Sequence, residues 1–147
     1  MLRRKKRGPV RSKKKTVDGI EFKSGLEAYM YTALKNAGIK AKYEGISYEL
    51  IPSFDFKNKS YEKQSNGKGE YKNRGGTKIR KITYTPDFTG TGFIIECKGR
   101  ANESFPIRWK LFKKYVSERL RGVTLYKPQN QKECDETVSL ILGKRKT

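Results

Sequence analysis

The stretch Tyr84-Thr-Pro-Asp-Phe-Thr-Gly-Thr-Gly-Phe-Ile-Ile-Glu-Cys-Lys98 has the pattern of a β-hairpin, and the rest of the chain is organised around it. Residues 82–85 have the composition of one arm, and residues 93–95 begin the other. The Thr-Gly-Thr-Gly sequence between the arms is typical of a turn. If Thr91 and Gly92 form a two-residue loop, this turn determines which residues of the two arms pair.

That register places two carboxylates opposite each other. Asp87 then faces Glu96 across the hairpin, and Lys98 shares the face of Glu96 because side chains alternate along a strand. A slip of one residue would move the two carboxylates to opposite faces. The hairpin therefore predicts a small patch of two carboxylates and one ammonium group.

Opposed carboxylates on a sheet repel each other unless a positive charge lies between them. Lys98 can supply that charge, and so can a divalent ion such as Mg²⁺, which prefers oxygen ligands. The tripeptide Glu-x-Lys also occurs at residues 21–23 and 70–72, so only the context of Glu96 distinguishes the third copy: an apolar run before it and Pro-Asp upstream. From the residues alone, a metal site and an incidental salt bridge at a strand edge both stay open.

The composition is strongly basic and contains no histidine. Lys and Arg number 35 against 15 Asp and Glu, giving a net charge of +20, so we expect an anionic partner, nucleic acid before a membrane surface. The absence of histidine excludes Ser-His triads, Cys-His nucleophiles and His-ligated zinc sites. There is no apolar run of the length, about 18 residues, that spans a bilayer, and two cysteines are too few for a disulfide framework. We therefore expect a cytoplasmic protein whose chemistry depends on carboxylates, lysines, tyrosines and metals.

The chain has the length of one domain. We expect residues 1–18 to form a disordered basic arm, residues 19–143 a single domain with a basic insertion at about 53–80, and residues 144–147 a basic tail. The insertion is either a surface excursion, part of which forms a further hairpin, or a nucleic-acid contact. Apolar spacing predicts helices at about 24–37, 104–120 and 130–142, and strands at 40–44, 46–51 and 123–126. The predicted apolar stripe of the second helix comprises Ile107, Leu111, Phe112, Tyr115 and Leu120.

Two further acids have alternative interpretations. Ser24-Gly-Leu-Glu27 matches a capping box, so Glu27 either caps the first helix or brings a third carboxylate to the hairpin. Glu44 is either an accessory acid of the same site or an exposed strand residue. The basic residues that we predict to contact nucleic acid are Lys13, Lys14, Lys15, Lys23, Lys68, Lys72, Arg74, Arg100, Lys110 and Lys113.

The predicted order is helix, strand, two hairpin strands, helix, strand and a last helix. With Pro86-Asp87 and Glu96-x-Lys98, this order resembles the PD-(D/E)xK nuclease superfamily, and within it the phage endonuclease I group of Holliday junction resolvases. The pieces that carry the resemblance are Phe22-Lys-Ser-Gly-Leu-Glu27, Gly38-Ile-Lys40 with Tyr43-Glu44, Tyr84-Thr-Pro-Asp-Phe88 and Ile95-Glu-Cys-Lys-Gly99. The resemblance implies an α/β (α+β) fold: a restriction-endonuclease-like αβββαβ core with a mixed central sheet flanked by helices, plus a C-terminal helix.

The resemblance also implies roles for particular residues. Asp87 and Glu96 would hold Mg²⁺ or Mn²⁺, and Glu27 would add a ligand or orient a second metal. Lys98 would position the attacking water or stabilise the charge that develops at phosphorus. The implied chemistry is metal-assisted hydrolysis of a phosphodiester.

We therefore expect a Mg²⁺-dependent DNA endonuclease of phage type, working in the host cytoplasm on branched DNA such as four-way junctions, as a homodimer. The insertion occupies the place of the short bridge through which endonuclease I subunits exchange elements, which puts a swapped dimer and junction specificity in question. Two alternatives stay open: a basic nucleic-acid-binding protein with an inactive nuclease-like core, and a nicking or restriction-like nuclease on ordinary duplex DNA.

Overall fold

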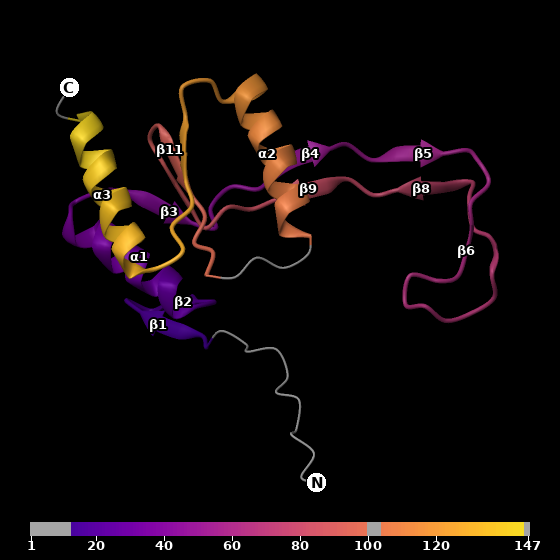
Figure 1. Cartoon of the computed structure of the whole chain (residues 1–147), viewed down its shortest axis with the longest axis horizontal. Coiled ribbons are helices and arrows are strands. Elements are labelled where there is room, and N and C mark those ends of the chain that lie inside the picture. The colour runs from indigo at the N-terminus through magenta and orange to yellow at the C-terminus, as the bar shows by residue number, and fades with distance from the viewer. Residues whose placement is uncertain (1–12, 100–103, 146–147) are drawn as a thin grey trace, which may run out of the picture.

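A four-stranded mixed sheet with helices on both faces forms the body of the protein. The computed structural model describes residues 13–99 and 104–145. The helices are α1 (Gly25–Asn36), α2 (Phe105–Arg119) and α3 (Gln131–Arg145), and the strands of the sheet are β3 (Ala41–Tyr43), β10 (Phe88–Gly90), β11 (Phe93–Ile95) and β12 (Thr124–Tyr126). The strand order is β12-β11-β10-β3, with β11 and β12 parallel and the other neighbours antiparallel. The predicted αβββαβ core with a C-terminal helix is therefore confirmed (Figure 1).

The register of the central hairpin is the predicted one. Phe88 pairs with Ile95 and Gly90 with Phe93 around the two-residue turn, so Asp87 and Glu96 follow as the next opposed pair. The predicted first arm was wrong, because β10 begins after Pro86. Residues 82–85 lie before that proline, which has no backbone N–H to donate, and their strand pairs elsewhere.

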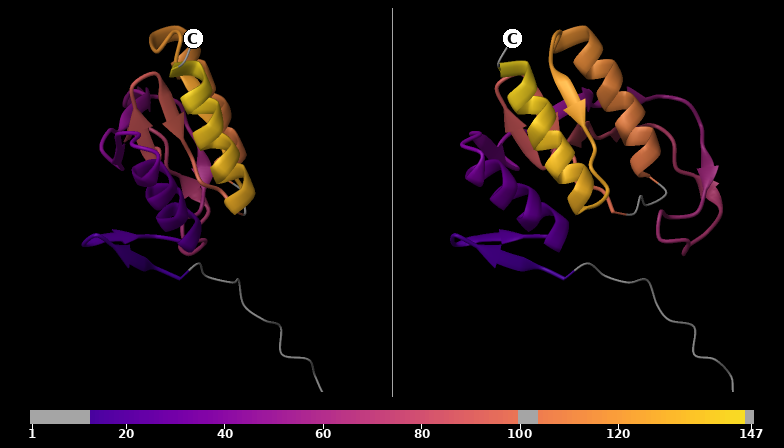
Figure 2. Two further views of the ribbon diagram at one scale, coloured as in Figure 1. Left: turned by 90° about the vertical axis from the view of Figure 1, so that its left-hand side faces the viewer. Right: turned by 60° about the vertical axis from the view of Figure 1, so that its left-hand side comes forward.

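The two faces of the sheet carry separate apolar clusters. Phe93 and Ile95 pack with α1 and α3, whereas Ile94 packs with α2, as the alternation along β11 requires. Figure 2 shows α1 and α3 side by side, and in its right-hand view β12 separates α3 from α2. This packing places β10 and β11 between the helices of the two faces.

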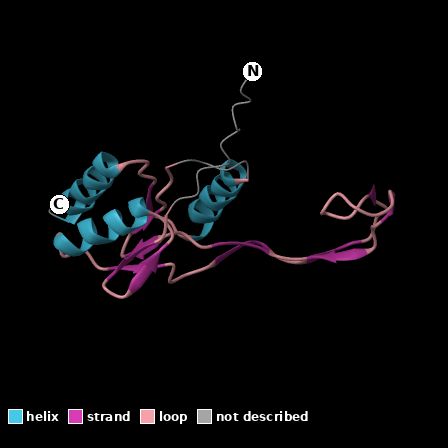
Figure 3. Cartoon of the chain, turned by 90° about the horizontal axis from the view of Figure 1, so that it is seen from below, coloured by secondary structure: helices cyan, strands magenta, loops and turns pink. Residues whose placement is uncertain are grey.

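A long two-stranded ribbon, which we call the arm, occupies residues 48–84. Its strand pairs are β4 (Tyr48–Ile51) with β9 (Ile82–Tyr84), β5 (Phe54–Phe56) with β8 (Thr77–Ile79), and β6 (Tyr61–Glu62) with β7 (Lys72–Asn73), all antiparallel. It continues from β3 and β10 and extends far from the body (Figures 1 and 3). The basic insertion at about 53–80 therefore forms a further hairpin, one of the alternatives left open by the sequence.

The basic N-terminal segment is ordered earlier than predicted. The expected disordered arm at 1–18 was wrong for its last residues, because β1 (Lys15–Val17) pairs with β2 (Ile20–Phe22). Asp18 and Gly19 both have positive φ, as a tight Asp-Gly hairpin turn requires. Asp18 also accepts hydrogen bonds from Tyr31 and Lys35 of α1, which hold the turn against that helix. Residues 1–12 lie outside the described part of the chain.

Two helix predictions needed correction. In α2, Ile107 is 65% exposed, whereas Phe105, Trp109 and Val116 are buried beside Phe112. The buried residues recur at intervals of four, three and four, so the apolar face that packs on the sheet is rotated from the predicted one. The helix α3 continues to Arg145, so the basic tail predicted from residue 144 begins within the last helix.

No helix in residues 13–99 or 104–145 has the length and apolar character needed to cross a membrane.

Candidate metal and nucleic-acid site

The two opposed carboxylates of the hairpin are almost completely buried. Asp87 is 6% exposed and Glu96 7% exposed, at the ends of β10 and β11. Asp87 Oδ2 accepts a hydrogen bond from the backbone N–H of Cys97 at 2.8 Å, which ties the two strand ends together. The backbone N–H of Glu44 donates to the Asp87 carbonyl at 2.8 Å. Buried acidic side chains are rare in proteins unless they have a partner, so the pair marks a candidate site.

Glu27 joins this pair from the first turn of α1. Its backbone N–H donates to Ser24 Oγ at 3.2 Å, so Ser24 caps the helix as predicted. Its carboxylate accepts from the backbone N–H of Lys23 at 2.9 Å and from the Tyr43 hydroxyl at 2.7 Å. Glu27 therefore does both things that the sequence left open: it belongs to a helix cap and it lies beside the hairpin carboxylates.

The pKa values of the two hairpin acids are raised, chiefly because both side chains are buried. Burial, together with the neighbouring carboxylates of Glu96 and Glu27, raises the pKa of Asp87 to about 9. Burial also raises the pKa of Glu96, although the Tyr84 hydroxyl and the Lys98 ammonium oppose that shift. A bound cation would stabilise the ionised form of both carboxylates and so lower their pKa values.

One carboxylate oxygen at this site is left without a partner. Glu96 Oε2 is buried and accepts no hydrogen bond of good geometry within the described chain, and the Tyr84 hydroxyl, although close enough to lower the pKa of Glu96, makes none there either. An unpaired buried polar atom is costly and calls for an explanation, such as an ion. Glu96 Oε2 is thus the atom most suited to a metal.

The donor set fits Mg²⁺ or Mn²⁺ better than a metal that needs a full protein cage. Within residues 13–99 and 104–145, no three His, Cys, Asp or Glu side chains are arranged so as to hold a metal unaided. Mg²⁺ commonly uses only one or two carboxylates and keeps several waters, so a pair such as Asp87 and Glu96 is compatible with it. Glu27 Oε2 already accepts two hydrogen bonds, which leaves it the role of a neighbouring charge or a ligand through its other oxygen.

Lys98 lies on an aromatic ring beside the acids. Its Nζ is 4.6 Å from the centroid of the Phe105 ring, at the start of α2. Lys127 Nζ lies 5.8 Å from the same centroid and 5.7 Å from that of Trp109. Such contacts between an ammonium group and an aromatic face are attractive and restrict where the ammonium group lies. The sequence analysis missed Phe105, although its position after Ser104 and before Pro106 marks a helix start.

A basic groove runs beside the acids. Its volume is about 900 Å³, and its walls comprise Lys13, Lys14, Lys15, Lys23, Ser24, Gly25, Leu26, Glu27, Cys97, Lys98 and Gly99. Four lysines predicted to bind nucleic acid therefore lie along the groove that contains Glu27 and Lys98. Two of them also form surface ion pairs, Lys14 with Glu21 at 3.1 Å and Lys23 with Glu44 at 2.8 Å. Glu44 is thus partnered by a lysine at the edge of the groove.

The other predicted basic contacts lie away from the groove. Lys68 and Lys72 are exposed on the arm, and Lys110 and Lys113 are exposed on α2. Arg74 instead donates to the backbone carbonyls of Glu62 and Glu70, at 3.0 and 3.2 Å, so it holds the end of the arm together. Arg100 lies outside the described residues.

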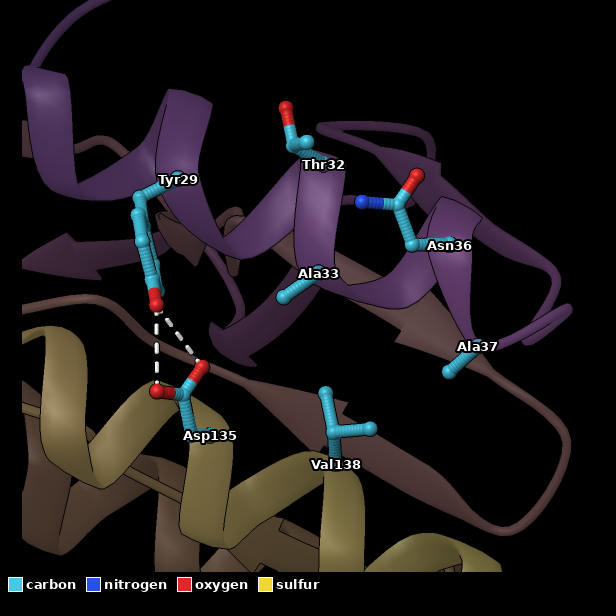
Figure 4. Close-up of a pocket in the computed structure, with 7 residues that line it drawn as sticks. All are labelled: Tyr29, Thr32, Ala33, Asn36, Ala37, Asp135 and Val138. Carbon is cyan, nitrogen blue, oxygen red and sulfur yellow. Dashed lines mark hydrogen bonds between the residues drawn. The ribbon is translucent and has the colours of Figure 1, made fainter.

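A second, smaller pocket lies between α1 and α3, and none of the site acids lines it. It measures about 430 Å³ and is lined by Tyr29, Thr32, Ala33, Asn36, Ala37, Asp135 and Val138. Figure 4 shows the Tyr29 hydroxyl pointing at Asp135, to whose carboxylate oxygens it donates at 2.9 and 3.0 Å. The pocket contains no paired acids, so it offers no comparable chemistry.

Comparisons with known proteins identify a family whose description names no activity. No curated protein and no solved structure matches the chain. One family model matches residues 7–129, a range that includes the arm, Glu27, Asp87, Glu96 and Lys98 and ends before α3. The chain therefore belongs to the family DUF1064, described as a protein of unknown function.

Proposed function

We propose that this protein is a metal-dependent DNA endonuclease that hydrolyses phosphodiester bonds. The observation that supports the proposal best is the meeting of Asp87, Glu96 and Lys98 at one end of the sheet, with a buried, unpaired Glu96 oxygen. The basic groove beside them suits a polyanion, since its lysines can replace the counterions of DNA phosphates. The resemblance to PD-(D/E)xK nucleases agrees with this choice of chemistry.

Each residue has a role in that proposal. Asp87 and Glu96 would hold Mg²⁺ or Mn²⁺, which when bound supplies Lewis acidity and lowers the pKa of water. Lys98, restrained by Phe105, would donate hydrogen bonds to the scissile phosphate or to the attacking water. Glu27, held by Tyr43, would keep a carboxylate beside Asp87. The lysines of the groove would orient the DNA backbone toward these groups.

A second candidate function is nucleic-acid binding without cleavage. The observation that favours it is the basic surface away from the acids, since Lys68 and Lys72 on the arm and Lys110 and Lys113 on α2 are all exposed. In this case the basic surface would bind DNA while the nuclease-like core stays inactive. The two candidates make different predictions for a single carboxylate.

The test is cleavage of a labelled four-way junction and a matched linear duplex, with Mg²⁺, with Mn²⁺ and with EDTA. We expect metal-dependent cleavage by the wild type, and a loss of about three orders of magnitude or more for Glu96→Gln, with salt-sensitive DNA binding retained. Glu136→Gln, on the exposed side of α3, is the matched control and should cleave normally. Tight binding without cleavage under both metals would favour the second candidate.

The same substrates test the finer parts of the proposal. Cleavage restricted to the junction would support action on branched DNA, whereas equal cleavage of both substrates would indicate a nuclease for ordinary duplex. The homodimer stays a prediction, and light scattering of the purified protein checks it. A monomeric mass would remove it.

A further inference from the structure

The arm presents an exposed ribbon whose surface is not covered by the rest of the described chain. Phe54 is 49% exposed and Ile79 39% exposed, and these two residues pair directly across β5 and β8. At the far end, Tyr61 is 56% and Tyr71 72% exposed, with ring centroids 6.4 Å apart. Exposed apolar groups in such a row indicate a surface that binds a partner.

The charge of the arm points to the chemistry of that partner. Between residues 53 and 81 the basic side chains are Lys57, Lys59, Lys63, Lys68, Lys72, Arg74, Lys78, Arg80 and Lys81, and the acidic ones are Asp55, Glu62 and Glu70. A polyanion would complement this excess, whereas a second copy of a chain with net charge +20 would be repelled by it.

A shallow cradle lies on the arm near the body. Its volume is about 510 Å³, and it is lined by Ser53, Lys78, Arg80, Lys81 and Thr83. Three positive side chains and two hydroxyl groups are the usual donors to phosphate oxygens. This cradle lies apart from the basic groove at the acids, because the two share no lining residue.

The far end of the arm is built to hold its shape. Asn73 Oδ1 accepts from the backbone N–H groups of Ser60 and Gly75, both at 3.0 Å. A Cβ atom at Gly75 would lie 1.9 Å from the carbonyl oxygen of Asn58, so only glycine fits where the two sides of the ribbon meet. Arg74 adds the two carbonyl contacts described above. An ordered ribbon loses little conformational entropy on binding, which favours a docking role.

We propose that the arm is a second DNA-binding element, which lies along or in the major groove of the duplex flanking the cleavage site. A two-stranded β-ribbon is of the right size for that groove. The inference rests on the proposed function in that it takes DNA to be the ligand of the basic groove as well. The arm then determines how much flanking duplex the enzyme needs, while the site at Asp87 and Glu96 performs hydrolysis.

The length of the arm sets the scale of the flank. The returning half of the arm runs from Lys72 to Tyr84. It advances by about 3.3 Å for each strand residue, or about 40 Å in all if fully extended. Duplex DNA rises about 3.4 Å for each base pair, so the arm can follow about 12 base pairs at most.

The test compares binding to duplexes of about 12 and about 30 base pairs, by fluorescence anisotropy, with affinities divided by the number of possible binding positions. The arm variant is Lys78→Ser/Arg80→Ser/Lys81→Ser. The matched control removes the same charge from exposed residues elsewhere, as Lys40→Ser/Arg121→Ser/Lys132→Ser. Circular dichroism verifies that both variants are folded.

We expect the arm variant to lose affinity for the long duplex by about tenfold or more relative to the control variant, and to lose little on the short duplex. The slope of log affinity against log salt should fall by about two on the long duplex, because two or more phosphate contacts disappear. The wild type should bind the long duplex more tightly per position than the short one.

Other outcomes separate this inference from the proposed function. Suppose that neither the wild type nor either variant cleaves DNA, but the arm variant loses affinity for the long duplex and not for the short one. The nuclease proposal then fails and the DNA-binding arm stands. If the arm variant and the control bind the long duplex equally, the inference is overturned. A change of oligomeric mass in the arm variant, with unchanged DNA binding, also overturns it and assigns the arm to a second copy of the chain.

Discussion

Replacing Asp87 with asparagine should stabilise the metal-free protein at neutral pH even as it abolishes cleavage. Burial and the carboxylates of Glu96 and Glu27 raise the pKa of Asp87 from 3.8 to about 9. The folded chain therefore keeps this proton where the unfolded chain has released it. It follows that the contribution of Asp87 to stability is present below about pH 4 and is lost as the pH rises from about 4 toward 9.

The size of the effect follows from that window. Each pH unit costs about 1.4 kcal/mol, so the penalty reaches about 4 kcal/mol at pH 7. Asparagine removes the ionisation but keeps the shape: its amide oxygen can accept the bond from the Cys97 N–H, and its NH₂ group can donate toward a neighbouring carboxylate. We expect the advantage of Asp87→Asn over the wild type to grow by about 2 to 4 kcal/mol between about pH 4 and pH 7.

Urea unfolding in EDTA, followed by fluorescence of the single tryptophan, Trp109, measures this difference. Asp55→Asn, at an exposed position on the arm, is the matched control and should show no such growth with pH. Saturating Mg²⁺ should stabilise the wild type by about 2 to 3 kcal/mol at about a hundred times its dissociation constant, and the variant far less. A difference between Asp87→Asn and the wild type that stays constant with pH would refute the reasoning.

Three further substitutions test single contacts. Tyr43→Phe removes the hydrogen bond from the Tyr43 hydroxyl to Glu27. We expect urea unfolding to show a loss of about 1 kcal/mol of stability, and single-turnover kinetics to show a lower cleavage rate with unchanged DNA affinity. A cleavage rate equal to that of the wild type would mean that cleavage does not depend on this hydrogen bond. Phe105→Leu removes the ring beneath Lys98 and should slow cleavage by about tenfold, whereas Phe105→Tyr, which keeps an aromatic face, should retain the rate; similar rates for both would remove Phe105 from the site. Gly90→Ala should lower the free energy of unfolding in urea by about 2 kcal/mol or more, because its Cβ would lie 2.2 Å from the Phe93 ring and 2.9 Å from the Lys40 carbonyl oxygen. Gly25→Ala, with open space around it, is the control and should cost little in the same urea unfolding experiment.

The parts of the fold that follow from the sequence depend on short-range rules. The turn at Thr91 and Gly92 and the alternation along a strand predicted that Asp87 faces Glu96, and the observed register agrees. The first helix begins and ends as its cap residues indicate: Ser24 caps its start, and Gly38 follows its end with φ of 69°. These features involve residues within a few positions of each other, whose geometry is set by backbone sterics and local hydrogen bonds.

The composition of the candidate site could be listed from the sequence, but its electrostatics could not. Glu27 lies 60 positions before Asp87, and only the packing of α1 on the sheet brings the two carboxylates close enough to raise a pKa. Lys98 contacts Phe105, the first residue of α2, and this contact also depends on where the helix packs. Such interactions depend on distance and burial in three dimensions, which periodicity does not contain.

By itself, the sequence determined the order of the three helices, the register of the central hairpin and the identity of the four candidate site residues, because each rests on local geometry or on a recognisable pattern of residues. The tertiary structure alone decided that residues 53–80 extend the hairpin as an arm, that Lys13, Lys14 and Lys15 line the groove beside Glu27, and that Glu96 Oε2 has no partner in the described chain. Each of these depends on which distant segments pack together and which atoms that packing removes from water, and so on free-energy differences summed over the whole fold.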